Sequence, residues 1–416
     1  TAHNVAVGYN AGTSVSTGTD NTIIGALAGD TLSATTRTVL VGKSAGTEIN
    51  STDAIGTVAI GFSAGSAISS GQGSVVIGYQ AAEIMTTADS NTIIGFQAGG
   101  FGSVGLTTSG YNTAVGYQAL GASSADAITT AGYNTAVGYR AGYELQEGGT
   151  NNAFFGAAAG KGTTTGSDNV VIGANAGNNL STSDYNVLIG REAGDAITTA
   201  ADGTVAVGYN AGSAITSGAG NVAVGHRALS ACTTAGSNTV IGYDAALLLA
   251  GSDNSGADNV VVGYKAFDAA TTNERQNVVI GSGAGGAIVG SPSDDNVLIG
   301  HNAGLGGGGT TEDCVVIGAS AMDGTGTNTQ TGTVAIGYFA LSDLSSGANC
   351  TGVGYRALRF TTTGAGNTAV GWDAGYYNET GDNNTYLGFY AGYGNDANHT
   401  GNTGLGARAL QNVTTG

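Results

Sequence analysis

The sequence predicts an all-β protein, a parallel β-solenoid of 23 coils of 17–18 residues each. A nine-residue unit, clearest at residues 112–120, recurs 23 times, with most copies 17 or 18 residues apart and none more than 22. Self-similarity at a short, nearly fixed period is typical of solenoids. The composition agrees, because 76 glycines, one proline and 10% charged residues are far from the usage of ordinary globular domains.

Each unit begins with a predicted strand, and positions are numbered here from the glycine that follows it, which is position 0. Position −3 is Val or Thr in every copy except Ala153, and position −1 is Val or Ile except at Phe155, Leu387 and Leu405. These β-branched residues at period 2 predict a short strand. Position −4 is Asn in 16 copies, which predicts a ladder of stacked amides. Its representatives are Asn21, Asn112, Asn134, Asn221 and Asn367.

Two small-residue corners follow the strand. The glycine at position 0 predicts a structural corner, and the turn residues at position −5, mostly Gly, Asp or Asn, predict further positive φ angles. Position +3 is Ala in all 23 copies, which indicates a packing site between coils with room for nothing larger. Representative corner glycines are Gly8, Gly25, Gly116, Gly138, Gly225 and Gly371, and representative packing alanines are Ala11, Ala119, Ala141, Ala228 and Ala374.

Position −2 lies on the strand face opposite −1 and −3, and it too is apolar in 21 copies, with Gly352 and Gly404 as exceptions. Strands that are apolar on both faces are buried on both faces, whereas one coil encloses one interior. We therefore expect the −2 face to meet identical chains around a common axis, as a homotrimer. A bundle of single-chain solenoids is the alternative.

Position +1 carries an aromatic side chain in 13 copies, which predicts a surface strip. In one interpretation the stacked rings shield the glycine corner or fill a groove between chains. In the other, the strip binds a sugar or a receptor. Its representatives are Tyr117, Tyr139, Tyr209, Tyr243 and Trp372.

No residue set points to chemistry. The 29 acidic and 11 basic residues give a net charge of −18, which argues against a nucleic-acid partner and favours a solvated surface, with divalent cations between neighbouring arms as the alternative. Cys314 and Cys350 both stand at position −4, two coils apart, too far for a disulfide, and look like substitutes for Asn. We expect no enzyme activity, no cofactor, no metal site and no membrane insertion.

Both ends of the sequence interrupt a repeat, and no shift in composition marks a boundary, so residues 1–416 are expected to form a single continuous solenoid without caps. Such a chain is either part of a longer fibre or a subunit that stacks end to end. Stacked at strand spacing, 23 coils would span roughly 110 Å.

Units such as residues 112–120 and 221–229 resemble the repeats of phage tail-fibre shafts and the Ser-Val-Ala-Ile-Gly head repeats of trimeric autotransporter adhesins. The resemblance implies a left-handed, trimeric β-roll on a virion or cell surface. We therefore expect a structural component of an extracellular fibre that gives reach and attachment to a host, with a possible receptor or glycan partner. The alternatives are a self-stacking extracellular filament or matrix protein and an ice-binding solenoid, although Thr-x-Thr arrays in consecutive coils are not evident.

Overall fold

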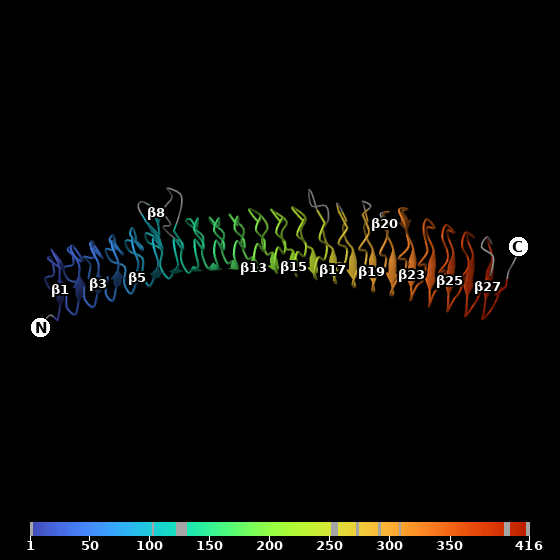
Figure 1. Cartoon of the computed structure of the whole chain (residues 1–416), viewed down its shortest axis with the longest axis horizontal. Helices are drawn as coiled ribbons and strands as arrows, with labels where there is room; N and C mark the ends of the chain where they lie inside the picture. The colour runs from blue at the N-terminus through green and yellow to red at the C-terminus, as the bar shows by residue number, and fades with distance from the viewer. Residues whose placement is uncertain are drawn as a thin grey trace. The chain divides into compact units, whose positions relative to one another are not determined.

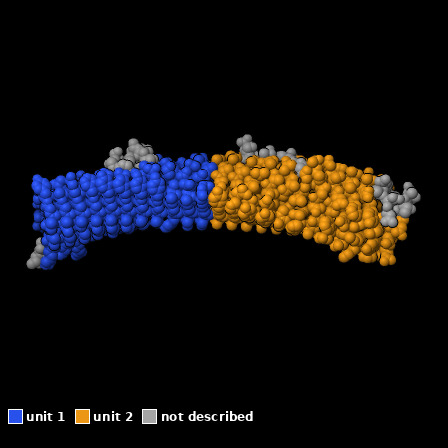
Figure 2. Space-filling view, viewed as in Figure 1, with its two compact units in different colours: residues 1–204 blue, residues 205–416 orange. Residues whose placement is uncertain are grey.

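The protein is described by a computed structural model that covers residues 3–101, 104–121, 131–250, 257–271, 274–289, 293–307, 309–394 and 400–412. The chain forms two compact units, residues 1–204 and 205–416 (Figure 2). Each unit is a parallel β-solenoid, and no helix occurs in the ranges just given. The all-β solenoid prediction is therefore confirmed, whereas the single domain over 1–416, the left hand and the trimer stay predictions.

The strands of unit 1 pair in parallel with the strand of the next coil, in register by repeat position, so that Val5 pairs with Thr22. Figure 1 shows them side by side within the unit. A short antiparallel hairpin, β7 (Gly100–Phe101) with β8 (Val104–Gly105), lies between β6 and β9 along the chain, and β6 and β9 still pair in parallel with each other. The repeat strands are β1 (Val5–Val7), β2 (Thr22–Ile24), β3 (Val39–Val41), β4 (Val58–Ile60), β5 (Val75–Ile77), β6 (Thr92–Ile94), β9 (Thr113–Val115), β10 (Thr135–Val137), β11 (Ala153–Phe155), β12 (Val170–Ile172) and β13 (Val187–Ile189).

Unit 2 repeats the same parallel pairing. A second parallel pair, β20 (Thr311–Glu312) with β22 (Gln330–Thr331), lies just before two of its repeat strands. The repeat strands are β14 (Val205–Val207), β15 (Val222–Val224), β16 (Thr239–Ile241), β17 (Val260–Val262), β18 (Val278–Ile280), β19 (Val297–Ile299), β21 (Val315–Ile317), β23 (Val334–Ile336), β24 (Thr351–Val353), β25 (Thr368–Val370), β26 (Thr385–Leu387) and β27 (Thr403–Leu405).

The −2 side chains point into the coil, and the prediction that they face other chains is wrong. Ile23, Val171 and Leu298 are 0% exposed, and Tyr386 is 4% exposed. The side chains at −3 and −1 point outward, because successive residues of a strand face opposite sides. Both faces of the strand are apolar, so the sequence pattern along the strand does not show which face is inside the coil.

The interior of each unit is narrow, and large and small residues alternate across it. Phe154 at −2 is fully buried, and a Cβ added to Gly160 would lie 2.2 Å from its ring. Tyr386 occupies the same position in β26, and a Cβ on Gly392 would lie 2.2 Å from that ring. Position +4 is therefore glycine beside a large −2 residue, because there is no room for both side chains.

The alanines at +3 close the interior at the corner after the glycine. Ala119, Ala141, Ala228 and Ala374 are 0% exposed, while Ala11, near the start of unit 1, is half-buried. The carbonyl of Ala119 accepts a hydrogen bond from the Gly99 N–H at 2.9 Å, which holds adjacent coils at strand spacing. Nothing larger than a methyl group fits without separating them.

Replacing Ala119 by leucine is expected to lower the free energy of unfolding by about 1–3 kcal/mol, the usual cost of overpacking a filled interior. Tyr117→Ser in the same coil removes a side chain that is 40% exposed, and is expected to cost less. The free energies of unfolding of the two variants are measured by chemical denaturation and compared. Equal stability of both would contradict the placement of position +3 inside.

The backbone turns at several left-handed positions in every coil. Position −5 has positive φ, as its turn residues predicted, including non-glycine residues such as Asp20 at +62° and Tyr133 at +62°. Position +2 also has positive φ, for example +55° at Asn10 and +60° at Leu27. The residue types at this position vary too much to predict a left-handed conformation. These turns set the direction in which each coil closes, and so decide which strand face is enclosed.

Candidate functional site

The feature of the surface that repeats in both units is an apolar strip, here called the outer face. It consists of the side chains at positions −3, −1 and +1 of each coil. In β12, Val170 is 37% exposed and Ile172 is 39% exposed, and in β16 Ile241 is 40% exposed. In most other coils the residues at −3 and −1 are partly exposed, so the outer face is a largely apolar surface, which in soluble proteins marks an interaction site.

Charge is distributed unevenly between the outer face and the rest of the chain. None of the 29 acidic residues occupies position −3, −1 or +1 in any of the 23 repeats. The basic residues and histidines in these columns are Lys43, Arg191, His226 and His301, all at position +1. The centre of an interface is depleted of charge in the same way, although acids are also poor strand formers and repel one another when stacked in register.

The aromatic residues at +1 form stacked columns along the edge of the outer face. In unit 1 the centroids of neighbouring rings lie 5.1–5.3 Å apart, with interplanar angles of 2–14°. Unit 2 carries two such columns, in one of which His226 stacks between two tyrosines. The columns are Phe62, Tyr79, Phe96, Tyr117 and Tyr139 in unit 1, and Tyr209, His226, Tyr243 and Tyr264, then Tyr338, Tyr355 and Trp372, in unit 2.

The predicted aromatic strip is exposed, with Tyr117 and Tyr209 at 40%, Tyr243 at 46%, Trp372 at 48% and Tyr139 at 51%. Within a column each ring turns its faces to the rings of the adjacent coils and presents its edge outward. Sugars stack on ring faces, so the interior of a column offers them little. Ring edges bearing apolar carbon instead pack well against other side chains.

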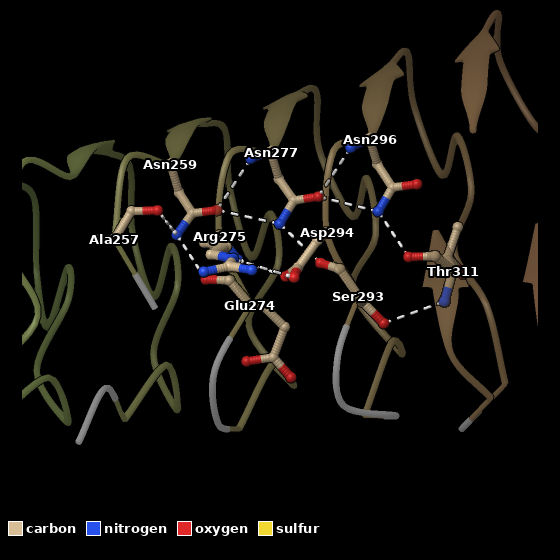
Figure 3. Close-up of polar contacts among 9 residues, drawn as sticks. All are labelled: Ala257, Asn259, Glu274, Arg275, Asn277, Ser293, Asp294, Asn296 and Thr311. Carbon is tan, nitrogen blue, oxygen red and sulfur yellow. Dashed lines mark hydrogen bonds and ion pairs between the residues drawn. The ribbon is translucent and has the colours of Figure 1, made fainter. Parts of the chain in front are cut away.

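The asparagines at −4 tie each coil to the next from inside the molecule. Asn21, Asn112, Asn134, Asn221 and Asn367 are buried, and each Oδ1 accepts the backbone N–H of the −4 residue in the following coil at 2.9–3.0 Å. Their Nδ2 atoms donate to carbonyls of the same following coil at 2.6–3.1 Å. In Figure 3 the amides of Asn259, Asn277 and Asn296 also bond to one another along the axis, at 2.9–3.0 Å.

The predicted corner glycines occupy a conformation closed to other residues. Gly8, Gly25, Gly116, Gly138, Gly225 and Gly371 have φ between +136° and +144°. A Cβ on any of them would lie 2.3–2.6 Å from the carbonyl oxygen of the equivalent glycine in the next coil. The glycines are therefore required by the close approach of the backbone between coils.

Arginine and aspartate at position +2 pair between neighbouring coils of unit 2. Arg227 donates to both carboxylate oxygens of Asp244 at 2.8 and 2.6 Å, and Arg356 donates to Asp373 with the same distances. Burial of Asp244 opposes its ionisation, but the hydrogen bond and charge of Arg227 outweigh it and lower the pKa of Asp244. The Asp373 carboxylate likewise raises the pKa of Arg356. Both pairs are satisfied within the chain.

Cys314 and Cys350 replace Asn in the ladder. The Cys350 thiol donates to the Gly364 carbonyl at 3.2 Å, 14 residues along, as the Asn367 amide does to Gly381. Cys232, Cys314 and Cys350 are buried, and none of them is in a disulfide. Burial raises the pKa of Cys314 to about 11 and also raises the pKa of Cys350, so these two thiols are protonated and unreactive at neutral pH.

Among the described residues, no group of three His, Cys, Asp or Glu side chains could hold a metal ion. The same residues contain no helix that is long and apolar enough to cross a membrane. Comparisons of the chain with protein-family models and with curated proteins give no match.

Proposed function

We propose that this chain is a structural component of an extended surface fibre, in which three copies associate along their outer faces and give reach and attachment to a host cell or surface. The observation that carries the proposal is the outer face itself, which is apolar, partly exposed and free of acids over both units. A virion tail fibre or a cell-surface adhesin would both use such a shaft.

A closed trimer covers the outer face better than an assembly without closed symmetry. A face two strand positions and one ring wide is narrow, and a three-fold axis brings three such faces together without leaving an apolar edge in water. The acidic residues outside the outer face then remain on the surface of the assembly. Their repulsion keeps separate fibres apart, which favours solubility.

The test is the native mass of the intact chain by light scattering, which is expected at three times 40.3 kDa. In the double variant Ile24→Asp with Ile241→Asp, each unit carries a charge on the outer face, at side chains that are 40% exposed. Burying these carboxylates together is costly, so the mass is expected to fall toward that of one chain.

The matched control places the same charges on equally exposed apolar residues outside the outer face. Ile55 is 39% exposed and Leu248 is 48% exposed, and their double Asp variant is expected to keep the native mass. A wild-type mass of one chain would overturn the proposal, as would an equal fall in mass for both variants. An open-ended mass would instead support the self-stacking filament.

Ice binding is the second candidate, and one observation favours it. Four consecutive coils of unit 2 carry threonine at −3 on the outer face beside an apolar −1 residue, at Thr351, Thr368, Thr385 and Thr403. A regular row of hydroxyl and methyl groups on a parallel sheet is a surface that could order water. Thermal hysteresis measured on a monomeric chain would support this candidate, and its absence would exclude it.

A further inference from the structure

One group of side chains in unit 2 departs from the repeat. At positions +5 and +6 most coils carry small or polar residues, but the last coils carry Arg359, Phe360, Tyr376, Tyr377 and Tyr393. With Phe339 they form what we call the Arg359 cluster. It lies beyond the +1 columns and so is distinct from the outer face.

The rings of the cluster form two stacked pairs set at right angles. Phe360 stacks on Tyr377 at 5.4 Å with an interplanar angle of 8°, and Tyr376 stacks on Tyr393 at 5.2 Å and 9°. Tyr376 meets both Phe360 and Tyr377 edge to face, at 85° and 89°. Unlike the +1 columns, each of these parallel stacks contains two rings, and Tyr390 meets Tyr393 at a tilt, with centroids 4.7 Å apart and an interplanar angle of 43°.

Arg359 lies between two of these rings with most of its hydrogen-bonding capacity unused. Its Cζ is 4.8 Å from the Phe339 centroid and 5.0 Å from the Phe360 centroid. Nη1 donates to the Tyr376 hydroxyl at 3.3 Å, the one side-chain hydrogen bond that Arg359 makes among the described residues. The Nε–H of Arg359 is buried and has no hydrogen-bond partner, so the donors left for a ligand are the remaining N–H groups of Nη1 and Nη2.

Two other arginines in aromatic surroundings donate to charged or amide side chains of neighbouring coils. Arg356 lies 4.9 Å from the Tyr355 centroid and 4.7 Å from that of Tyr376, but it is paired with Asp373. Arg140 lies between two tyrosines and donates to Gln118 at 2.9 Å. Among the described residues no ion pair joins Arg359 to a carboxylate within 4.0 Å; the charge of Arg359 acts on the Asp323 carboxylate, where it opposes the rise in pKa that burial causes.

We propose that the Arg359 cluster binds a carboxylated sugar, such as a uronic or sialic acid unit of a surface glycan. The guanidinium would take the carboxylate, because its planar donors match two oxygens. Tyr377 and Tyr393, which are half-exposed, would pack ring carbon against the C–H face of the sugar, and their hydroxyls would bond to sugar hydroxyls. The proposal names a ligand class for the attachment role, and in that respect rests on the proposed function.

The experiment is calorimetric titration of the intact chain with three probes, glucuronate, glucose and acetate. Glucuronate is expected to bind about tenfold or more tightly than glucose, because a charge-assisted bidentate pair is added, and more tightly than acetate, which lacks the ring. Arg359→Gln is expected to reduce glucuronate affinity to the glucose level while leaving glucose unchanged. Tyr377→Leu is expected to weaken both sugars.

Arg37→Gln, which removes an exposed arginine of unit 1, is the matched control and is expected to change nothing. Equal affinity for acetate and glucuronate would overturn the proposal, as would unchanged glucuronate binding by Arg359→Gln or no binding of glucuronate at millimolar concentration. Native mass is measured on the same samples, so a trimer that fails to bind glucuronate disproves this site alone, and a monomer that binds it disproves the fibre assembly alone.

Discussion

Replacing Gly138 by alanine is expected to lower the free energy of unfolding of unit 1 by about 3–5 kcal/mol, the sum of backbone strain and enforced separation of coils. Its φ is +144°, a conformation that residues with a Cβ avoid. The added Cβ would lie 2.3 Å from the Gly156 carbonyl oxygen, an overlap that no rotamer can relieve because both groups belong to the backbone. Denaturant unfolding monitored by circular dichroism measures the loss.

Gly203→Ala in the same unit is the matched control for Gly138→Ala. Gly203 also has positive φ, at +70°, but an added Cβ there meets nothing within 4 Å. Only the left-handed conformation then carries a cost, about 1 kcal/mol. Equal stability of the two variants would mean that coils do not approach each other at position 0.

Replacing Asn277 by leucine is expected to lower the stability of unit 2 by about 2–4 kcal/mol, because buried backbone groups lose their partners. Asn277 is 0% exposed, its Oδ1 accepts the Asn296 N–H at 3.1 Å, and its Nδ2 donates to the Ser293 carbonyl at 2.8 Å (Figure 3). Leucine offers neither group. Hydrogen exchange is expected to show the Asn296 amide losing protection first, alongside a lower denaturation midpoint.

Asn277→Ser is the conservative variant, since serine already serves at position −4 elsewhere. The Ser74 hydroxyl accepts the Asn91 N–H at 3.2 Å and donates to the Ala88 carbonyl at 3.4 Å. Asn277→Ser is therefore expected to cost about 1 kcal/mol, one net hydrogen bond. If serine and leucine destabilise equally, the side-chain volume of Asn277 matters and its amide does not.

Much of the fold could be predicted because each requirement is local and is repeated many times. Val, Ile and Thr at −3 and −1 predict a strand in any surroundings, and 23 copies separate the pattern from chance. The alanine at +3 and the asparagine at −4 were placed by the same recurrence. The left-handed residue at +2 had no such signal, because asparagine, leucine, arginine and tyrosine all occur there.

The candidate site could be predicted only in part. The ring strip at +1 was visible, and the structure adds that its rings stack face to face in three columns. The apolar face beside it was assigned to the wrong side of the strand. The Arg359 cluster was missed, although aromatic residues at +5 and +6 in consecutive coils are a departure from the repeat that the sequence already contains.

By itself the sequence determined that the protein is a stack of coils, where each strand begins, and which corners must be glycine or alanine, because these depend on chain geometry within one coil and its neighbour. Only the tertiary structure decided which apolar face is enclosed. Valine and isoleucine satisfy either side of a strand equally, so the choice falls to the left-handed turns at −5 and +2, which close each coil over position −2 and leave −3 and −1 outside.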